Sequence, residues 1–182
     1  MAIHKDLEKI LITGEEIQRR VRELGEQITR DFQGEEVLLV GILKGAVIFF
    51  ADLARQIDLP VKMDFMAISS YGSATKSTGV VRILKDLDRD ITGQNVIIVE
   101  DIVDSGMSLS FLKENLLSRG AKTLKICVLL DKPERRRIDI DVDYRGFVVP
   151  DEFVVGYGLD YAEYYRAMPD IGVLKPEVYT ND

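Results

Sequence analysis

The sequence predicts an α/β fold in which helices flank a central, mainly parallel sheet. Short apolar runs bounded by turn residues alternate with segments of helical periodicity, and this alternation is typical of parallel βαβ units. The chain has 182 residues, of which 46% are hydrophobic, so it can bury a substantial core. It contains no internal repeat or linker. We therefore expect a single domain over residues 1–182, with a small appended lobe.

The expected elements follow one another along the chain. Thr13 and Glu16 have capping-box spacing, and apolar residues then recur at helical intervals as far as Phe32. Two further helices are expected, over 46–57 and 106–119. Buried strands are expected over 37–43, 61–69, 80–84, 95–99 and 123–130. The polar segment 70–79 has the composition of a mobile loop, and the later runs 144–148, 153–155 and 171–174 are expected to be edge strands or a small lobe.

Composition excludes several kinds of chemistry. Cys127 and His4 are the only residues of their types, which excludes an intrachain disulfide, Cys/His zinc sites and histidine triads. Acid–base or metal chemistry must then use carboxylates, lysine or tyrosine, and Cys127 is expected to be buried. The net charge of −7 disfavours a nucleic-acid binder.

Membrane insertion and secretion are also disfavoured. The longest apolar run, residues 46–51, is much shorter than the roughly 20 residues that a membrane span needs. Charged residues occupy the part of the N-terminus where a secretory signal would be apolar. We expect a cytoplasmic protein.

The stretch DSGMS, residues 104–108, is typical of a phosphate-binding helix start. Ser105 and Ser108 offer hydroxyl groups, Gly106 allows close approach of the backbone, and a helix N-terminus favours an anion. The alternative is structural: either serine can be a plain N-cap, and Asp104 can cap the helix or order a water molecule.

Two further carboxylates precede this stretch, at the expected end of a strand. Glu100 and Asp101 can accept hydrogen bonds from hydroxyl groups while the loop amides hold an anion. A ligand that carries both a phosphate and vicinal hydroxyls, such as ribose 5-phosphate, suits both parts. In an open α/β sheet such a ligand binds beyond the carboxyl ends of the strands.

These residues resemble the phosphoribosyl-diphosphate signature of type I phosphoribosyltransferases. More narrowly, the chain resembles the hypoxanthine-guanine phosphoribosyltransferase family over nearly its whole length. The matching segments, in the family's order, are LKG at 43–45, SSYG at 69–72, VEDIVDSGMS at 99–108, LDK at 130–132 and FVVGYGLDY at 153–161. The resemblance implies the type I phosphoribosyltransferase fold, with a flexible catalytic loop. It also implies a hood lobe formed by N-terminal residues and the segment after about residue 150.

The implied reaction moves the 5-phosphoribosyl group of 5-phosphoribosyl 1-diphosphate to N9 of hypoxanthine or guanine. It gives IMP or GMP and diphosphate, which is purine salvage. The resemblance implies that Glu100 and Asp101 bind the ribose hydroxyls and Mg²⁺, and that Asp160 serves a second Mg²⁺. It implies that Asp104 is the catalytic base for the purine N7 proton. The expected substrate-binding residues are Lys44, Gly45, Ser70, Tyr71, Glu100, Asp101, Ile102, Val103, Asp104, Ser105, Gly106, Met107, Ser108, Lys132, Phe153, Val154, Asp160 and Arg166.

The resemblance assigns the other contacts as well. Backbone amides at Lys44 and Gly45 are expected to hold diphosphate, together with Arg166, and the family often has a non-proline cis peptide that would join Leu43 to Lys44. Ser70–Tyr71 is expected to close over the reacting centre.

The base is expected to be read by a later segment. Lys132 donates to the purine O6, Phe153 stacks on the ring, and backbone groups at Val154 and near Asp160 read its edge. Gly158 stands where some relatives have alanine, and we expect it to loosen this pocket. Each residue also has an ordinary structural interpretation, such as a surface lysine, a core aromatic or a loop acid. The run 134–137 is interpreted as a solvated or subunit-contacting face without a catalytic role.

Other functions are weaker matches. Preference for xanthine is left open, whereas a pyrimidine substrate does not suit Lys132 and Phe153. A nucleic-acid-binding regulator with this fold would need a broad basic face, and a phosphoacceptor signalling domain would not need the DSGMS loop. A homodimer or homotetramer is expected from the resemblance only.

Overall fold

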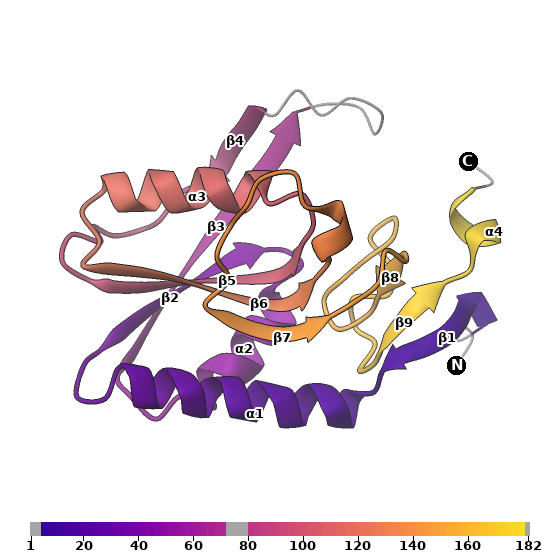
Figure 1. The fold of residues 1–182 in the computed structure, drawn as a ribbon, viewed down its shortest axis with the longest axis horizontal. Helices are drawn as coiled ribbons and strands as arrows, with labels where there is room; N and C mark the ends of the chain where they lie inside the picture. Colours follow the sequence, from indigo (N-terminus) through magenta and orange to yellow (C-terminus); the bar gives the residue numbers. More distant parts are fainter. Residues whose placement is uncertain (1–4, 72–79, 181–182) are drawn as a thin grey trace.

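The computed structural model describes residues 5–71 and 80–180, in which strands form one large and one small sheet (Figure 1). The large sheet has the strand order β4-β3-β2-β5-β6-β7. Its neighbours are parallel except for the antiparallel pair β3 and β4. The strands are β2 (Val37–Leu43), β3 (Val61–Tyr71), β4 (Val80–Lys85), β5 (Asn95–Val103), β6 (Thr123–Asp131) and β7 (Tyr144–Val148). The predicted α/β fold with a mainly parallel sheet is confirmed.

Helices cover both faces of this sheet (Figure 1). Helices α1 (Gly14–Asp31) and α2 (Val47–Ala54) lie on one face, and α3 (Met107–Ser118) lies on the other. Alternate residues of β5 point to opposite faces, so Ile97 packs in the core with α1 and α2 while Ile98 packs with α3. The predicted capping box is present, because Thr13 N–H donates to Glu16 Oε2 at 2.8 Å and Glu16 N–H donates to Thr13 Oγ1 at 3.3 Å.

The small sheet joins the two ends of the described chain. Its order is β1 (Leu7–Ile12), β9 (Ile171–Leu174), β8 (Val154–Val155), and both pairs are antiparallel. Figure 1 shows β1 and β9 side by side, with the short helix α4 (Pro176–Tyr179) after β9. The sequence did not predict β1, because its hydrogen-bonding partner lies at the other end of the sequence.

Several element boundaries differ from prediction. Strand β5 continues past Val99, because its pairing with β6 extends to Val103 and Asp131. Strand β3 continues to Tyr71, which pairs with Val80 of β4, so the predicted loop begins later than residue 70. Helix α2 ends at Ala54, not at 57, and Gln56 and Ile57 form tighter turns instead. The rest of the predicted mobile loop, 72–79, and His4 lie outside the described residues.

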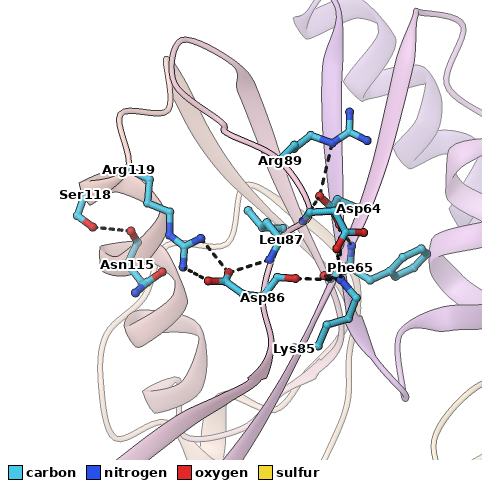
Figure 2. Close-up of polar contacts among 10 residues, drawn as sticks. Asp64, Phe65, Lys85, Asp86, Leu87, Arg89, Asn115, Ser118 and Arg119 are labelled. Atoms are coloured by element: carbon cyan, nitrogen blue, oxygen red, sulfur yellow. Dashed lines mark hydrogen bonds and ion pairs between the residues drawn. The ribbon is translucent and has the colours of Figure 1, made fainter.

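The fold also contains a buried cysteine and a buried aspartate that belongs to a charged cluster on β3 and β4. Cys127 is buried, as predicted. Asp64 of β3 is also buried: its Oδ1 accepts from Phe65 N–H at 2.8 Å and its Oδ2 from Asp88 N–H at 3.0 Å. Figure 2 shows Asp64 beside Lys85 and Arg89, which extend toward it from the end of β4 and the loop that follows. None of the helices in the described part of the chain is long and apolar enough to cross a membrane.

Candidate active site

A cavity of about 440 Å³ lies at the carboxyl ends of β2 and β5 and the start of α3. This is the edge of a parallel sheet at which ligands bind. It brings together residues from four separate segments of the sequence. The predicted site residues that line it are Gly45, Glu100, Asp101, Ile102, Val103, Asp104, Ser105, Gly106, Ser108, Asp160 and Arg166.

A second cavity, of about 350 Å³, adjoins the first. Its lining includes the predicted base-reading residues Lys132, Phe153 and Val154. Ile102, Asp104 and Asp160 line both cavities, so the two spaces meet at the predicted catalytic aspartate. Only 7% of Lys132 is exposed, and its Nζ donates to the Glu152 carbonyl at 2.7 Å. Lys132 is therefore a buried cavity residue and not an ordinary surface lysine.

Some predicted residues do not reach either cavity with their side chains. The side chain of Lys44 is 68% exposed and pairs with Glu163 Oε2 at 2.9 Å, and Lys44 is not among the residues that line either cavity. Met107 is not among the lining residues, although its N–H donates to Ser105 Oγ at 3.3 Å. Ser70 and Tyr71 belong to β3 by their backbone, but their side chains lie outside what the structure describes.

The loop between β5 and α3 has the backbone geometry of an anion site. Gly106 is the N-cap of α3 and has a φ of +82°, a conformation that L side chains rarely adopt. A Cβ at Gly106 would also lie 2.8 Å from the Ile138 carbonyl oxygen. Within the described residues, no hydrogen bond is formed by the backbone N–H groups of 104, 105, 106 and 108. These donors are available to an anion.

The loop after β2 packs closely against Asp101 and Gly158. The peptide bond between Leu43 and Lys44 is cis, as expected from the family. A Cβ at Gly45 would lie 1.9 Å from Asp101 Oδ2, and a Cβ at Gly158 would lie 2.1 Å from the Gly45 carbonyl oxygen. Gly158 packs against the loop at Gly45 and is not among the residues that line the second cavity, and its effect on the purine pocket stays a prediction.

The adjacent carboxylates Glu100 and Asp101 are destabilised in their charged forms. Burial raises the pKa of Glu100 well above its ordinary value, and repulsion from Asp101 raises it further. Burial also raises the pKa of Asp101, although the positive charge of Arg166 opposes that rise. A cation bound between the two carboxylates would relieve both effects.

Three residues that line these cavities carry buried polar atoms without a hydrogen-bond partner in the structure. They are Asp104 Oδ1, Glu152 Oε2 and Arg166 Nε. Arg166 is otherwise held in place, because its Nη1 donates to the Gly158 carbonyl at 2.8 Å and its Nη2 lies 3.2 Å from Asp160 Oδ1. A buried polar atom without a partner costs free energy, which a ligand can recover.

Two residues that line the second cavity, Tyr179 and Glu152, were not predicted from the sequence. The ring of Tyr179 stacks on Phe153 with ring centres 4.8 Å apart and planes inclined by 20°. Pro176 at the start of α4 was the one available signal for a short helix here. Glu152 was not predictable, because it contributes its backbone carbonyl to Lys132.

Comparison with known proteins agrees with this geometry. A family model described as "Phosphoribosyl transferase domain" matches residues 9–162. The chain is 56% identical over 174 residues to the hypoxanthine-guanine phosphoribosyltransferase of Bacillus subtilis, covering 96% of this chain and 97% of that protein. The chain belongs to the hypoxanthine-guanine phosphoribosyltransferase family. The family membership that the five motifs predicted is confirmed.

A solved structure and a longer relative extend the comparison. A crystal structure of a hypoxanthine phosphoribosyltransferase from Staphylococcus aureus superposes with a TM-score of 0.96 at 51% identity, over 100% of this chain and 98% of that one. The type I phosphoribosyltransferase fold is thereby confirmed. The chain is also 51% identical over 179 residues to the bifunctional protein TilS/HprT of Listeria monocytogenes. It covers 28% of the length of that protein.

Proposed function

We propose that this protein transfers the 5-phosphoribosyl group of 5-phosphoribosyl 1-diphosphate to N9 of hypoxanthine or guanine. The products are IMP or GMP and diphosphate, as in purine salvage. The observation that carries the proposal is the meeting of the two cavities at Asp104, one lined by an anion-binding loop and the other by a buried lysine. The names of relatives that are more than half identical over nearly the whole chain support it.

The sugar phosphate would lie in the first cavity. The free N–H groups of 104, 105, 106 and 108 and the hydroxyls of Ser105 and Ser108 would hold the 5-phosphate, next to Gly106 and the backbone of Met107. Glu100 and Asp101 would accept hydrogen bonds from the ribose hydroxyls. Ile102 and Val103 would shape the wall between sugar and base.

Diphosphate would leave toward the loop after β2. Within the described residues, no backbone carbonyl accepts a hydrogen bond from Lys44 N–H or Gly45 N–H, so both donors are free for it. Arg166, whose Nε is buried and has no partner, would add a positive charge there. We include Ser70 and Tyr71 as groups that close the site, on the resemblance alone.

The donor set suits Mg²⁺ carried in with the substrate. No group of three acidic, histidine or cysteine side chains that could hold a metal occurs among residues 5–71 and 80–180. Because Mg²⁺ keeps several waters and is bound by one or two carboxylates plus phosphate oxygens, Glu100 and Asp101 suffice to hold it. Asp160 would serve a second ion beside Arg166. When bound, Mg²⁺ neutralises charge on the departing diphosphate.

The purine would lie in the second cavity. Lys132 Nζ uses one donor on the Glu152 carbonyl and retains others for the purine O6. A 6-amino purine presents a donor at that position, so adenine would be rejected. Phe153 would stack on the base, and backbone groups at Val154 and near Asp160 would read its edge.

Asp104 would take the N7 proton as N9 attacks the ribose C1′. It lies between the two cavities, which is where a proton acceptor must be to reach a bound purine. The substrate N–H would also supply a donor for its buried, unpartnered carboxylate.

A spectrophotometric assay with Mg²⁺ and 5-phosphoribosyl 1-diphosphate tests the function. Hypoxanthine, guanine, xanthine, adenine and uracil are offered in turn, and we expect turnover of hypoxanthine or guanine and none of adenine or uracil. Folded protein that converts neither hypoxanthine nor guanine would refute the proposal. Faster turnover of xanthine would favour the xanthine alternative.

The role of Lys132 is tested by Lys132→Ala. We expect the KM for hypoxanthine to rise about 10- to 100-fold, since a hydrogen bond from a charged donor is lost, while the KM for 5-phosphoribosyl 1-diphosphate stays within about twofold. Lys125→Ala is the matched control, because Lys125 is on β6, the strand that ends just before Lys132, but pairs with Asp143 and lines neither cavity. Equal weakening of both substrates would contradict the assignment.

The homodimer or homotetramer and the cytoplasmic location stay predictions from the sequence.

A further inference from the structure

The segment 132–138 after β6 lies along the loop 103–106 and takes up its carbonyl groups. Lys132 N–H donates to the Val103 carbonyl at 3.0 Å. Arg136 Nε donates to the Asp104 carbonyl at 3.2 Å. The N–H groups of Arg137 and Ile138 both donate to the Ser105 carbonyl at 3.0 Å. Three successive carbonyls of the loop therefore point toward the same segment.

This pairing determines where the loop's N–H groups point. In a trans peptide the carbonyl of one residue and the N–H of the next point in opposite directions. The carbonyls of 103, 104 and 105 face the segment 132–138, so the N–H groups of 104, 105 and 106 face away from it. Those N–H groups form no hydrogen bond within the described residues. The segment thus fixes the direction of these free donors, which point away from it.

Arg136 is the one side chain that takes part in this pairing. Its Nη2 forms an ion pair with Asp131 Oδ1, and its Nη1 lies 3.5 Å from the Ile140 carbonyl. The other oxygen of the buried Asp131 pairs with Arg145 Nε at 2.7 Å. With only 18% of its side chain exposed, Arg136 is held in one place by both ends of its guanidinium group.

The two neighbouring arginines differ from Arg136. Arg135 is exposed and pairs with Asp151 at 2.7 Å, and both residues line the second cavity. Arg137 is also exposed, and its side chain forms no hydrogen bond or ion pair with any described residue. The interpretation of the whole run 134–137 as a solvated face is therefore wrong for Arg136.

We propose that Arg136 is a positioning residue for the sugar-phosphate loop, which it fixes through the Asp104 carbonyl. The proposal rests on the proposed function. Anchored on Asp131, the guanidinium group orients the peptide that joins Asp104 to Ser105. It thereby fixes the direction of the Ser105 N–H, which would donate to the 5-phosphate. It also fixes the position of the backbone that carries the Asp104 carboxylate.

The test compares Arg136→Gln with Arg137→Ala. Both changes remove one positive charge, at adjacent positions. Arg137→Ala also keeps the backbone N–H of residue 137, so its hydrogen bond to the Ser105 carbonyl is retained. For Arg136→Gln we expect the KM for 5-phosphoribosyl 1-diphosphate to rise about 10- to 100-fold, while the KM for hypoxanthine changes less than about threefold. Arg137→Ala should change neither KM by more than about twofold.

A second variant and a binding measurement separate positioning from general destabilisation. Arg136→Lys keeps a positive charge for Asp131, but an ammonium group cannot contact both Asp131 and the Asp104 carbonyl as the guanidinium group does. We therefore expect the KM for 5-phosphoribosyl 1-diphosphate to rise less than in Arg136→Gln. Tyr144→Phe, which loses a hydrogen bond to Asp31 far from the cavities, is a stability control that should leave both KM values unchanged. Calorimetric titration of each variant with ribose 5-phosphate measures loop binding without turnover.

The outcomes decide between the explanations. Weaker ribose 5-phosphate binding in Arg136→Gln than in Arg137→Ala supports the proposal. Equal binding in the two variants, or an equal rise in both KM values of Arg136→Gln, overturns it. Wild-type protein that converts no purine would refute the proposed function instead, and the comparison of ribose 5-phosphate binding would still decide the role of Arg136.

Discussion

Asp64 lies within strand β3 and Asp104 lies in the loop after β5, and only the Asp64 carboxylate is fully paired. Asp64 is 3% exposed and surrounded by donors, with two backbone N–H groups on its oxygens and Arg89 Nε 3.5 Å from Oδ2 (Figure 2). Asp104 has a buried oxygen with no partner. A fully paired carboxylate stabilises the fold, whereas an unpaired one is a place for a ligand. Substitutions at the two positions should therefore affect different properties.

The largest effect is expected for Asp104→Asn. The amide cannot accept the purine proton, so kcat should fall on the order of 10²- to 10⁴-fold. Ribose 5-phosphate binding, measured by calorimetry, should persist, because the loop N–H groups are retained. Asp64→Asn serves as the control that makes the same chemical change at the paired position. An unchanged kcat in Asp104→Asn would remove this residue from the base role.

A smaller effect, and on stability alone, is expected for Asp64→Ala. This change leaves the N–H groups of Phe65 and Asp88 and the Arg89 cation without their acceptor. Breaking a buried ionic cluster costs about 3 kcal/mol of unfolding free energy. For a chain of this size that lowers Tm by roughly 6–12 °C. Thermal denaturation measures the loss, and kcat below Tm should stay within about twofold of wild type. A large fall in kcat would contradict the separation of the two aspartates.

The smallest effect is expected for Asp86→Asn. Asp86 pairs with Arg119 at 2.8 Å just after the C-terminal end of α3 (Figure 2), and 49% of the Asp86 side chain is exposed. Such a pair contributes only about 0.5 kcal/mol, so Tm should fall by roughly 1–2 °C. The same comparison repeated in about 1 M salt should show a smaller difference, because salt screens exposed charges.

The contribution of Asp86 should also depend on pH. The hydrogen bond from Arg119 lowers the pKa of Asp86 below its ordinary value. A carboxylate with a lowered folded-state pKa contributes its full stabilisation above the unfolded pKa of about 3.9 and loses it as pH falls through the folded value. The Tm values of wild type and Asp86→Asn should therefore converge in acid. A constant difference down to pH 2 would contradict the assignment.

The sequence predicted elements well where the signal was local. Strands β2, β7 and β9 have the predicted bounds, because each is a short segment rich in apolar or aromatic residues and bounded by polar or turn residues. Strand β5 was predicted too short because its last residues include Glu100 and Asp101, whereas ladder pairing uses the backbone and tolerates polar side chains. Strand β1 was missed because it depends on β9, which is distant in sequence.

The residues of the site also differ in whether a local sequence signal marks them. The motif 104–108 could be recognised because its residues are contiguous, and the family motif then pointed to Lys132. The link from Arg136 to Asp104 spans 32 positions, so nothing local marks it. The run of arginines looked uniform in sequence, and only packing against Asp131 distinguishes Arg136 from its neighbours.

The single buried cysteine has a practical consequence for measurement. Cys127 is inaccessible, and burial raises the pKa of its thiol, so it should not react with maleimides in the native protein. A Tyr164→Cys variant would place one accessible thiol on an exposed position close in sequence to Arg166. A fluorophore attached there would report changes around this segment on substrate binding, with the native cysteine left in place.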